Sequence, residues 1–144
     1  MVFLDGDVLR EVFGNDLGHS REERLKSAMR NSRLCKMLSD QGIDVVCATI
    51  SLYRECQDWN RAHISGYHEI YLRVPMKVLV ERDQKQLYSR ALRGEVKDVM
   101  GVDLPVEEPR HPELIVENDG SEKPAVLAQR IFDLFVNSSR NEKK

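Results

Sequence analysis

Apolar and polar residues alternate in blocks along this chain, and the blocks predict strands separated by helices. Short apolar runs rich in β-branched residues and bounded by turn residues are typical of strands buried in a parallel sheet. The run "IDVVCATI" is unbroken, so we expect a strand covered on both faces. The strands predicted in this way occupy residues 2–4, 43–50, 69–74 and 114–118.

The segments between these runs have apolar residues at helical spacing. Ser20 and Glu23 have the spacing of a capping box, which predicts that a helix begins there, and Gly42 is expected to end it. Pro75 is expected to open another helix. Ser121 is the predicted cap of a last amphipathic helix.

Strands that alternate with helices through short connections predict an α/β fold with a parallel sheet. At 144 residues the chain has the length of one domain. We expect that domain to span residues 1–136, with a solvated tail at residues 137–144. Ligands of such sheets bind at the carboxyl ends of the strands, so functional residues should follow the strands directly.

The charge and cysteine content exclude several classes of partner. Net charge is −2 and basic residues are mixed with acidic ones, so we expect neither a nucleic acid polymer nor a membrane surface as partner. The apolar stretch at residues 45–50 is too short to cross a bilayer, and we expect a cytoplasmic protein. Cys35, Cys47 and Cys56 form no CxxC pair, which favours reduced structural thiols.

Charged and hydroxyl side chains follow the first two predicted strands. The stretch "LDGDVLR" places Asp5, Asp7 and Arg10 after the first strand, and Ser51 and Arg54 follow the second. Carboxylates hold Mg²⁺ or orient a hydroxyl, and arginines bind phosphate through paired hydrogen bonds. These groups on one edge of a sheet favour phosphoryl transfer, and therefore a kinase.

Each of these features also has an ordinary structural explanation. Asp-Gly-Asp after a strand is most often a turn, Ser51 is a reasonable strand-end cap, and Arg54 is a reasonable surface residue. The polar, basic segment 81–101 is either a mobile lid or a solvated helix and loop. The combination on one edge favours the kinase interpretation.

Several stretches of the sequence resemble motifs of the adenylylsulfate kinases, which use ATP to phosphorylate the 3′-hydroxyl of a sulfated adenosine nucleotide. "LDGDVLR" is similar to the family's LDGD-x-x-R, "DLGHSREERLK" to DLGFS-x-x-DR, and "ATISLYR" to A-x-ISPYR. "RDQKQLYSRALRGEVKDVMGVDLPVEEP" is similar to the RDPKGLY lid and the GEIK-x-FTGID loop. The resemblance implies a P-loop NTPase-like, three-layer fold with helices on both faces of the sheet, ATP and Mg²⁺ as cofactors, a nucleotide substrate, and a homodimer.

The resemblance also implies roles for individual residues. Asp5 and Asp7 would serve Mg²⁺ and the acceptor hydroxyl, and Ser51 matches the serine assigned as a phosphorylated intermediate. Arg10 and Arg24 would hold the acceptor's phosphate. The other positions assigned to substrate binding are His19, Ser27, Ile50, Lys85 and Val99.

The departures from the family pattern are confined to the acceptor pocket. His19 and Val99 stand where the family has the two Phe residues that clamp adenine, Ser27 replaces an Asn, and Met29 replaces an Arg. Such base stacking contributes about 1–3 kcal/mol per base. The changes favour a different acceptor, such as the cytidine diphosphoramidate phosphorylated by relatives in capsular polysaccharide pathways. The alternative acceptor is adenylylsulfate itself, as in sulfate assimilation.

The sequence contains no Gly-Lys-Ser or Gly-Lys-Thr, so it lacks the GxxxxGK[ST] P-loop that precedes LDGD in the family. We therefore expect a fold missing its first strand and P-loop, with an interrupted hydrogen-bonded ladder. A gene model begun at an internal Met, a truncated gene or an engineered fragment would each explain this. The chain alone is expected to be inactive, and the alternative function is a non-catalytic remnant that binds nucleotide or pairs with a full-length partner.

Overall fold

The computed structural model describes residues 1–83 and 85–141, with side chains as far as residue 135. The chain divides into two compact units. The first comprises residues 1–67 and 90–110, and the second comprises residues 68–89 and the chain from residue 111 onward. The helix α5 (Leu87–Leu92) spans the boundary between them.

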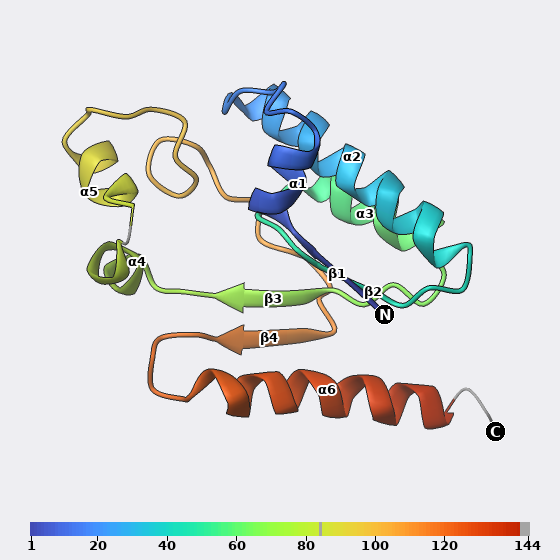
Figure 1. The fold of residues 1–144 in the computed structure, drawn as a ribbon. Coiled ribbons are helices and arrows are strands. Elements are labelled where there is room, and N and C mark those ends of the chain that lie inside the picture. The colour runs from blue at the N-terminus through green and yellow to red at the C-terminus, as the bar shows by residue number, and fades with distance from the viewer. Residues whose placement is uncertain (84, 142–144) are drawn as a thin grey trace. The chain divides into compact units, whose positions relative to one another are not determined.

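The first unit is a parallel strand pair covered by two helices. Strands β1 and β2 pair in parallel from Val2 opposite Val45 to Asp5 opposite Ala48. Helices α2 and α3 lie side by side along this pair (Figure 1). The elements of this unit are β1 (Val2–Asp5), α1 (Gly6–Val12), α2 (Arg21–Ser39), β2 (Val45–Ala48) and α3 (Arg54–His63).

The core of this unit lies between α2 and α3. Ala28, Tyr53 and Cys56 are buried together, and Leu25, Met29 and Met100 pack around them. Arg21 places its guanidinium over the Tyr53 ring, 5.6 Å from its centroid. The loop that contains Met100 therefore packs against the two helices.

The second unit is another parallel pair. Strands β3 and β4 pair from Ile70 opposite Leu114 to Arg73 opposite Glu117, and α6 runs alongside β4 (Figure 1). His68 contacts the edge of the Phe135 ring, which ties α6 to the start of β3. The elements are β3 (Ile70–Arg73), α4 (Met76–Arg82), β4 (Leu114–Glu117) and α6 (Pro124–Asn141).

Most predicted elements are confirmed. Each predicted strand is present, though β2 is shorter than residues 43–50, and parallel pairing confirms the α/β class. Ser20 and Glu23 form the predicted capping box, and Pro75 stands directly before α4. In the described chain the strands form two separate pairs, so the expected interruption of the ladder is present.

The structure differs from three expectations. Ser121 does not cap α6, because the helix begins at Pro124, a residue favoured at the first helical position, and the Ser121 N–H donates to Asp119 Oδ1. Strand β2 is not covered on both faces, because Val46 is 44% exposed and Cys47 and Ala48 are exposed as well. Helix α6 extends past residue 136 into the predicted tail, whose residues 142–144 lie outside the described residues.

None of the helices in the described residues is long and apolar enough to cross a bilayer. All three cysteines are free thiols, as the sequence predicts.

Candidate functional site

Asp5 is both the last residue of β1 and the N-cap of α1. Its Oδ1 accepts hydrogen bonds from the backbone N–H groups of Asp7 (2.9 Å) and Val8 (3.2 Å). A Cβ on Gly6 would lie 3.2 Å from the Thr49 methyl group, so glycine lets this turn lie directly against the residue that follows β2. The turn therefore carries one carboxylate that caps the helix and a second, Asp7, that is exposed.

The chain after β2 lies next to this turn because Asp5 is paired with Ala48. The hydroxyls of Thr49 and Ser51 share a hydrogen bond of 2.8 Å. Ile50, between them, is 63% exposed. The predicted meeting of the two strand ends at one edge is thus present, with Thr49 as a hydroxyl that the sequence analysis did not select.

Arg10 holds the loop that precedes α2. Its Nη1 donates to the Leu17 carbonyl at 2.6 Å, and its Nη2 donates to the Gly18 carbonyl at 3.3 Å. Glu23 supports the same loop, since its Oε1 accepts from the Gly18 N–H at 3.0 Å. Hydrogen bonds from Ser20 and the Gly18 backbone hold the pKa of the Glu23 carboxyl below its ordinary value.

Arg24 connects this loop to the turn at residue 98. Its Nε donates to the His19 carbonyl and its Nη2 to the Asp98 carbonyl, both at 2.8 Å. Asp98 has φ 64°, a left-handed conformation that Asp tolerates better than most residues. The Asp103 carboxylate fixes this turn by accepting from the N–H groups of Asp98 (2.7 Å) and Val99 (2.6 Å). These hydrogen bonds from the Val99 and Asp98 backbone also lower the pKa of Asp103.

The two positions of the expected base clamp differ sharply in exposure. Val99 is 2% exposed and His19 is exposed. Partial burial lowers the pKa of His19, and the cationic Arg10 and Arg24 lower it further. At neutral pH the His19 ring is therefore uncharged and accessible, whereas Val99 belongs to the packed interior of its loop.

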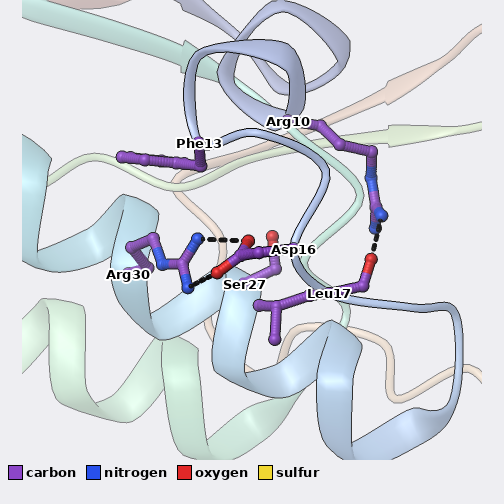
Figure 2. A pocket seen from close by; sticks show the side chains of 6 residues that line it. All are labelled: Arg10, Phe13, Asp16, Leu17, Ser27 and Arg30. Atoms are coloured by element: carbon purple, nitrogen blue, oxygen red, sulfur yellow. Dashed lines mark hydrogen bonds and ion pairs between the residues drawn. The ribbon is translucent and has the colours of Figure 1, made fainter.

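Figure 2 shows a small pocket between α1, its following loop and α2. Its volume is about 10 Å³, room for roughly one water molecule. Arg30 donates two hydrogen bonds to the Asp16 carboxylate, at 2.9 and 2.8 Å, and its guanidinium lies over the Phe13 ring at 4.9 Å. The hydrogen bond from Arg30 lowers the pKa of Asp16. The residues around the pocket are Arg10, Phe13, Asp16, Leu17, Ser27 and Arg30.

This pocket brings together two predicted site residues, Arg10 and Ser27, and adds residues that were not selected from the sequence. Asp16 is the first residue of the DLG motif, which is the sequence signal that points to it, and Phe13 lies three positions earlier. Lys85 lies in the second unit, exposed, in the turn between α4 and α5. Among residues 1–83 and 85–141, no three His, Cys, Asp or Glu side chains are grouped so as to hold a metal ion.

Parallel strands with helices between them, and acidic, hydroxyl and arginine side chains at two adjoining strand ends, define an α/β protein of the kind that binds nucleotides. The family model described as "Adenylylsulphate kinase" matches residues 1–117. The chain belongs to the adenylylsulphate kinase family, whose members are phosphotransferases with the P-loop NTPase fold.

The relatives include proteins with different acceptors in their names. The chain is 39% identical to cytidine diphosphoramidate kinase of Campylobacter jejuni over 118 residues, which are 82% of this chain and 68% of the relative. It is 38% identical to a probable adenylyl-sulfate kinase of Archaeoglobus fulgidus over 120 residues, 83% of this chain and 77% of the relative.

A solved structure of Mycobacterium tuberculosis APS kinase CysC, in complex with AMPPNP and APS, is similar to this fold. It superimposes with a TM-score of 0.83 at 30% identity, over 92% of this chain and 78% of that chain.

Proposed function

We propose that this chain is the acceptor-binding part of a kinase that transfers the γ-phosphate of ATP to a hydroxyl of a nucleotide. The observation that carries the proposal is the meeting of two strand ends. Asp5 and Ala48 are paired across β1 and β2, so the acidic turn and the Thr49–Ser51 segment share one edge. Phosphoryl transfer depends mainly on such positioned charges rather than on a covalent device.

The acidic turn fits Mg²⁺ because Mg²⁺ is usually held by one or two carboxylates together with substrate phosphates. Asp5 and Asp7 would hold the ion, which would neutralise charge on the transferred phosphoryl group. Asp5 uses Oδ1 to cap α1, so Oδ2 is the oxygen that we assign to the ion. Asp7 is also proposed to orient the acceptor hydroxyl, and Ser51 presents a hydroxyl on the same edge.

Arg10 and Arg24 are proposed to bind the acceptor's phosphates. Each guanidinium donates to two loop carbonyls, and each has five N–H donors. The remaining donors allow phosphate to bind without dismantling the loop. Ser27 and Ile50 would line the acceptor, and Lys85 is proposed to bind substrate because it matches the lid motif of the family.

ATP is the proposed phosphoryl donor, but its phosphates need a cradle. The 144 residues contain no GxxxxGK[ST] segment. We infer that residues 1–144 supply acceptor recognition and acidic groups, and that they do not turn over ATP by themselves.

We propose a cytidine diphosphate derivative as the acceptor. His19 offers one accessible neutral ring where the family pattern has Phe, and the buried Val99 offers none. A smaller pyrimidine depends less on a two-sided aromatic clamp than adenine does. The Campylobacter relative, named cytidine diphosphoramidate kinase, favours the same acceptor, whereas the Archaeoglobus relative favours adenylylsulfate.

The decisive experiment uses a fusion in which a P-loop segment from an adenylylsulfate kinase precedes Met1. Transfer of labelled γ-phosphate to cytidine diphosphate derivatives and to adenylylsulfate is measured for the fusion and for the 144-residue chain. We expect transfer by the fusion only. Asp7→Asn should lower kcat roughly a hundredfold, whereas Glu11→Gln, which also replaces an exposed carboxylate of α1 by its amide, should not. Equal effects of the two variants would refute the role of Asp7.

A non-catalytic remnant, which binds nucleotide or pairs with a full-length partner, is the second candidate. The DNA upstream of the Met1 codon separates the two. An in-frame GxxxxGK[ST] segment supports the kinase, whereas a stop codon or unrelated sequence supports the remnant. Under the first candidate we place the enzyme in the cytoplasm, as a homodimer serving capsule polysaccharide synthesis or sulfate assimilation.

A further inference from the structure

Glu107 lies in the loop that follows the turn at Asp98, and its carboxylate contacts the first residues of two helices. Its Oε1 accepts a hydrogen bond from Arg21 Nη2 at 2.9 Å, and its Oε2 accepts from the Arg54 backbone N–H at 2.8 Å. Arg21 begins α2 and Arg54 begins α3. The two carboxylate oxygens therefore connect one loop residue to two helices of the same unit.

The contact with α3 supplies a cap that the residues next to this helix do not provide. Tyr53 stands at the N-cap position, and its side chain makes no capping hydrogen bond. The first N–H groups of a helix have no partner within the helix, and the helix dipole favours a carboxylate beside them. The hydrogen bonds from the Arg54 backbone and from Arg21 also lower the pKa of Glu107, so its carboxylate is charged at neutral pH.

The same loop is attached to the helices at two further points. Arg24, on α2, donates to the Asp98 carbonyl at 2.8 Å. Met100 packs against the core between α2 and α3, where the Tyr53 hydroxyl donates to Met100 Sδ at 3.7 Å. Glu107 therefore holds the far end of a segment whose near end is the turn bound by Arg24.

We propose that Glu107 is a positioning residue of the acceptor site, which holds residues 98–107 against α2 and α3 and thereby keeps Arg24 oriented toward the acceptor. The effect on the acceptor rests on the proposed function, in which Arg24 binds the acceptor's phosphate. The effect on the loop depends only on the contacts of the two Glu107 oxygens. If the loop separated from the helices, Arg24 would lose a fixed partner, and binding the acceptor would cost more conformational entropy.

Glutamine is not equivalent to glutamate at this position, because the two carboxylate oxygens have different donors as partners. The amide of Glu107→Gln has one acceptor oxygen and an NH2 group that only donates. The amide oxygen can take one of the two places, and the NH2 group then faces a donor at the other. The substitution preserves the size of the side chain and removes one of its two connections.

Hydrogen exchange of the 144-residue chain tests the effect on the loop. The amides of residues 98, 99 and 101–104 are hydrogen-bonded within the loop, so their exchange reports its opening. We expect Glu107→Gln to speed this exchange at least roughly threefold, and to change exchange in the middle of α2 by less than about twofold. Unchanged exchange in the loop, or an equal increase throughout the unit, would overturn the proposal.

Glu22→Gln is the matched control, because Glu22 is the neighbour of Arg21 and its ion pair with Lys26 stays within α2. It should leave exchange in the loop unchanged. An increase in loop exchange as large as that of Glu107→Gln would show that loss of any carboxylate near Arg21 is enough, and would count against Glu107 as the connection.

A double-mutant comparison tests the connection to α2. Arg21→Met keeps the apolar stem of Arg21 and removes its donors, while the amide oxygen of Glu107→Gln can still accept from the Arg54 N–H. We therefore expect Glu107→Gln to speed loop exchange by a smaller factor in the Arg21→Met background than in the parent. An equal factor in the two backgrounds would show that Glu107 does not act through Arg21.

The effect on the acceptor is measured with the P-loop fusion, using cytidine diphosphoramidate and adenylylsulfate. Glu107→Gln should raise KM for the acceptor at least roughly threefold, with kcat and KM for ATP changed by less than about twofold. Partial unfolding would instead lower the apparent kcat. A lower kcat at an unchanged KM for the acceptor would refute the positioning role. If the fusion transfers no phosphate, the proposed function fails, and hydrogen exchange still decides whether Glu107 holds the loop.

Discussion

Val99→Phe introduces the residue that the family pattern has at this position. The structure nevertheless predicts that this substitution destabilises the protein. Val99 is 2% exposed, and its backbone N–H is held by Asp103. A Phe ring at this position has to displace packed neighbours. Inserting extra bulk into a packed site costs about 1–3 kcal/mol, so we expect the free energy of unfolding to fall by that amount.

Urea unfolding followed by fluorescence of the single tryptophan, Trp59, measures this directly, because Trp59 lies in the same unit as Val99. With an m-value of about 2 kcal/mol per molar urea, typical of small domains, the midpoint should fall by roughly 0.5–1.5 M.

Val106→Phe is the matched control. Val106 lies in the same loop region but is 37% exposed, so the same substitution there should change stability by less than about 0.5 kcal/mol. Equal midpoints for Val99→Phe and Val106→Phe would refute the inference that Val99 is interior. Position 99 would then be free to stack on a base.

Three further predictions concern the loops around the candidate site. Ser20→Ala removes the capping-box hydroxyl and should lower stability by about 1 kcal/mol in the same urea assay; an unchanged midpoint would contradict the cap. The pKa values of Asp16, Glu23 and Asp103 are lowered from the ordinary values of 3.8 for Asp and 4.5 for Glu. These carboxylates therefore stabilise the fold at pH values above the ordinary pKa, and this stabilisation should disappear as the pH falls through the lowered pKa values. Asp103→Asn should therefore flatten the acid side of a stability–pH curve, and an unaltered curve would count against it. Arg24→Gln should speed amide hydrogen exchange at residues 98–103 but not in α3, and uniform exchange would show that Arg24 does not fix the turn.

Local sequence patterns predicted the elements that local chemistry determines. The Ser20–Glu23 spacing is enough to place the start of α2, and the β-branched run is enough to place β2. Asp5 and Ser51 were expected at one edge because parallel strands end together, and the pairing of Asp5 with Ala48 agrees. The prediction that Ser121 caps α6 was wrong because this residue, although of a type favoured at caps, stands three positions before Pro124, where the helix begins.

What the sequence could not supply is the tertiary partner of each charged or apolar side chain. Arg10 and Arg24 look like free phosphate ligands in the sequence, yet both hold loop carbonyls. Val99 sits in a polar loop segment, and only the folded turn at Asp98 buries it.

The most direct test of the whole account is the acceptor preference of the P-loop fusion, measured as kcat/KM for a cytidine diphosphate derivative and for adenylylsulfate. Loss of even one stacking partner worth about 1–3 kcal/mol predicts that the cytidine derivative is preferred by at least roughly fivefold. His19→Phe, which changes an exposed position, should move the preference back toward adenylylsulfate. Preference for adenylylsulfate in the unmutated fusion, with no further gain from His19→Phe, would contradict the account.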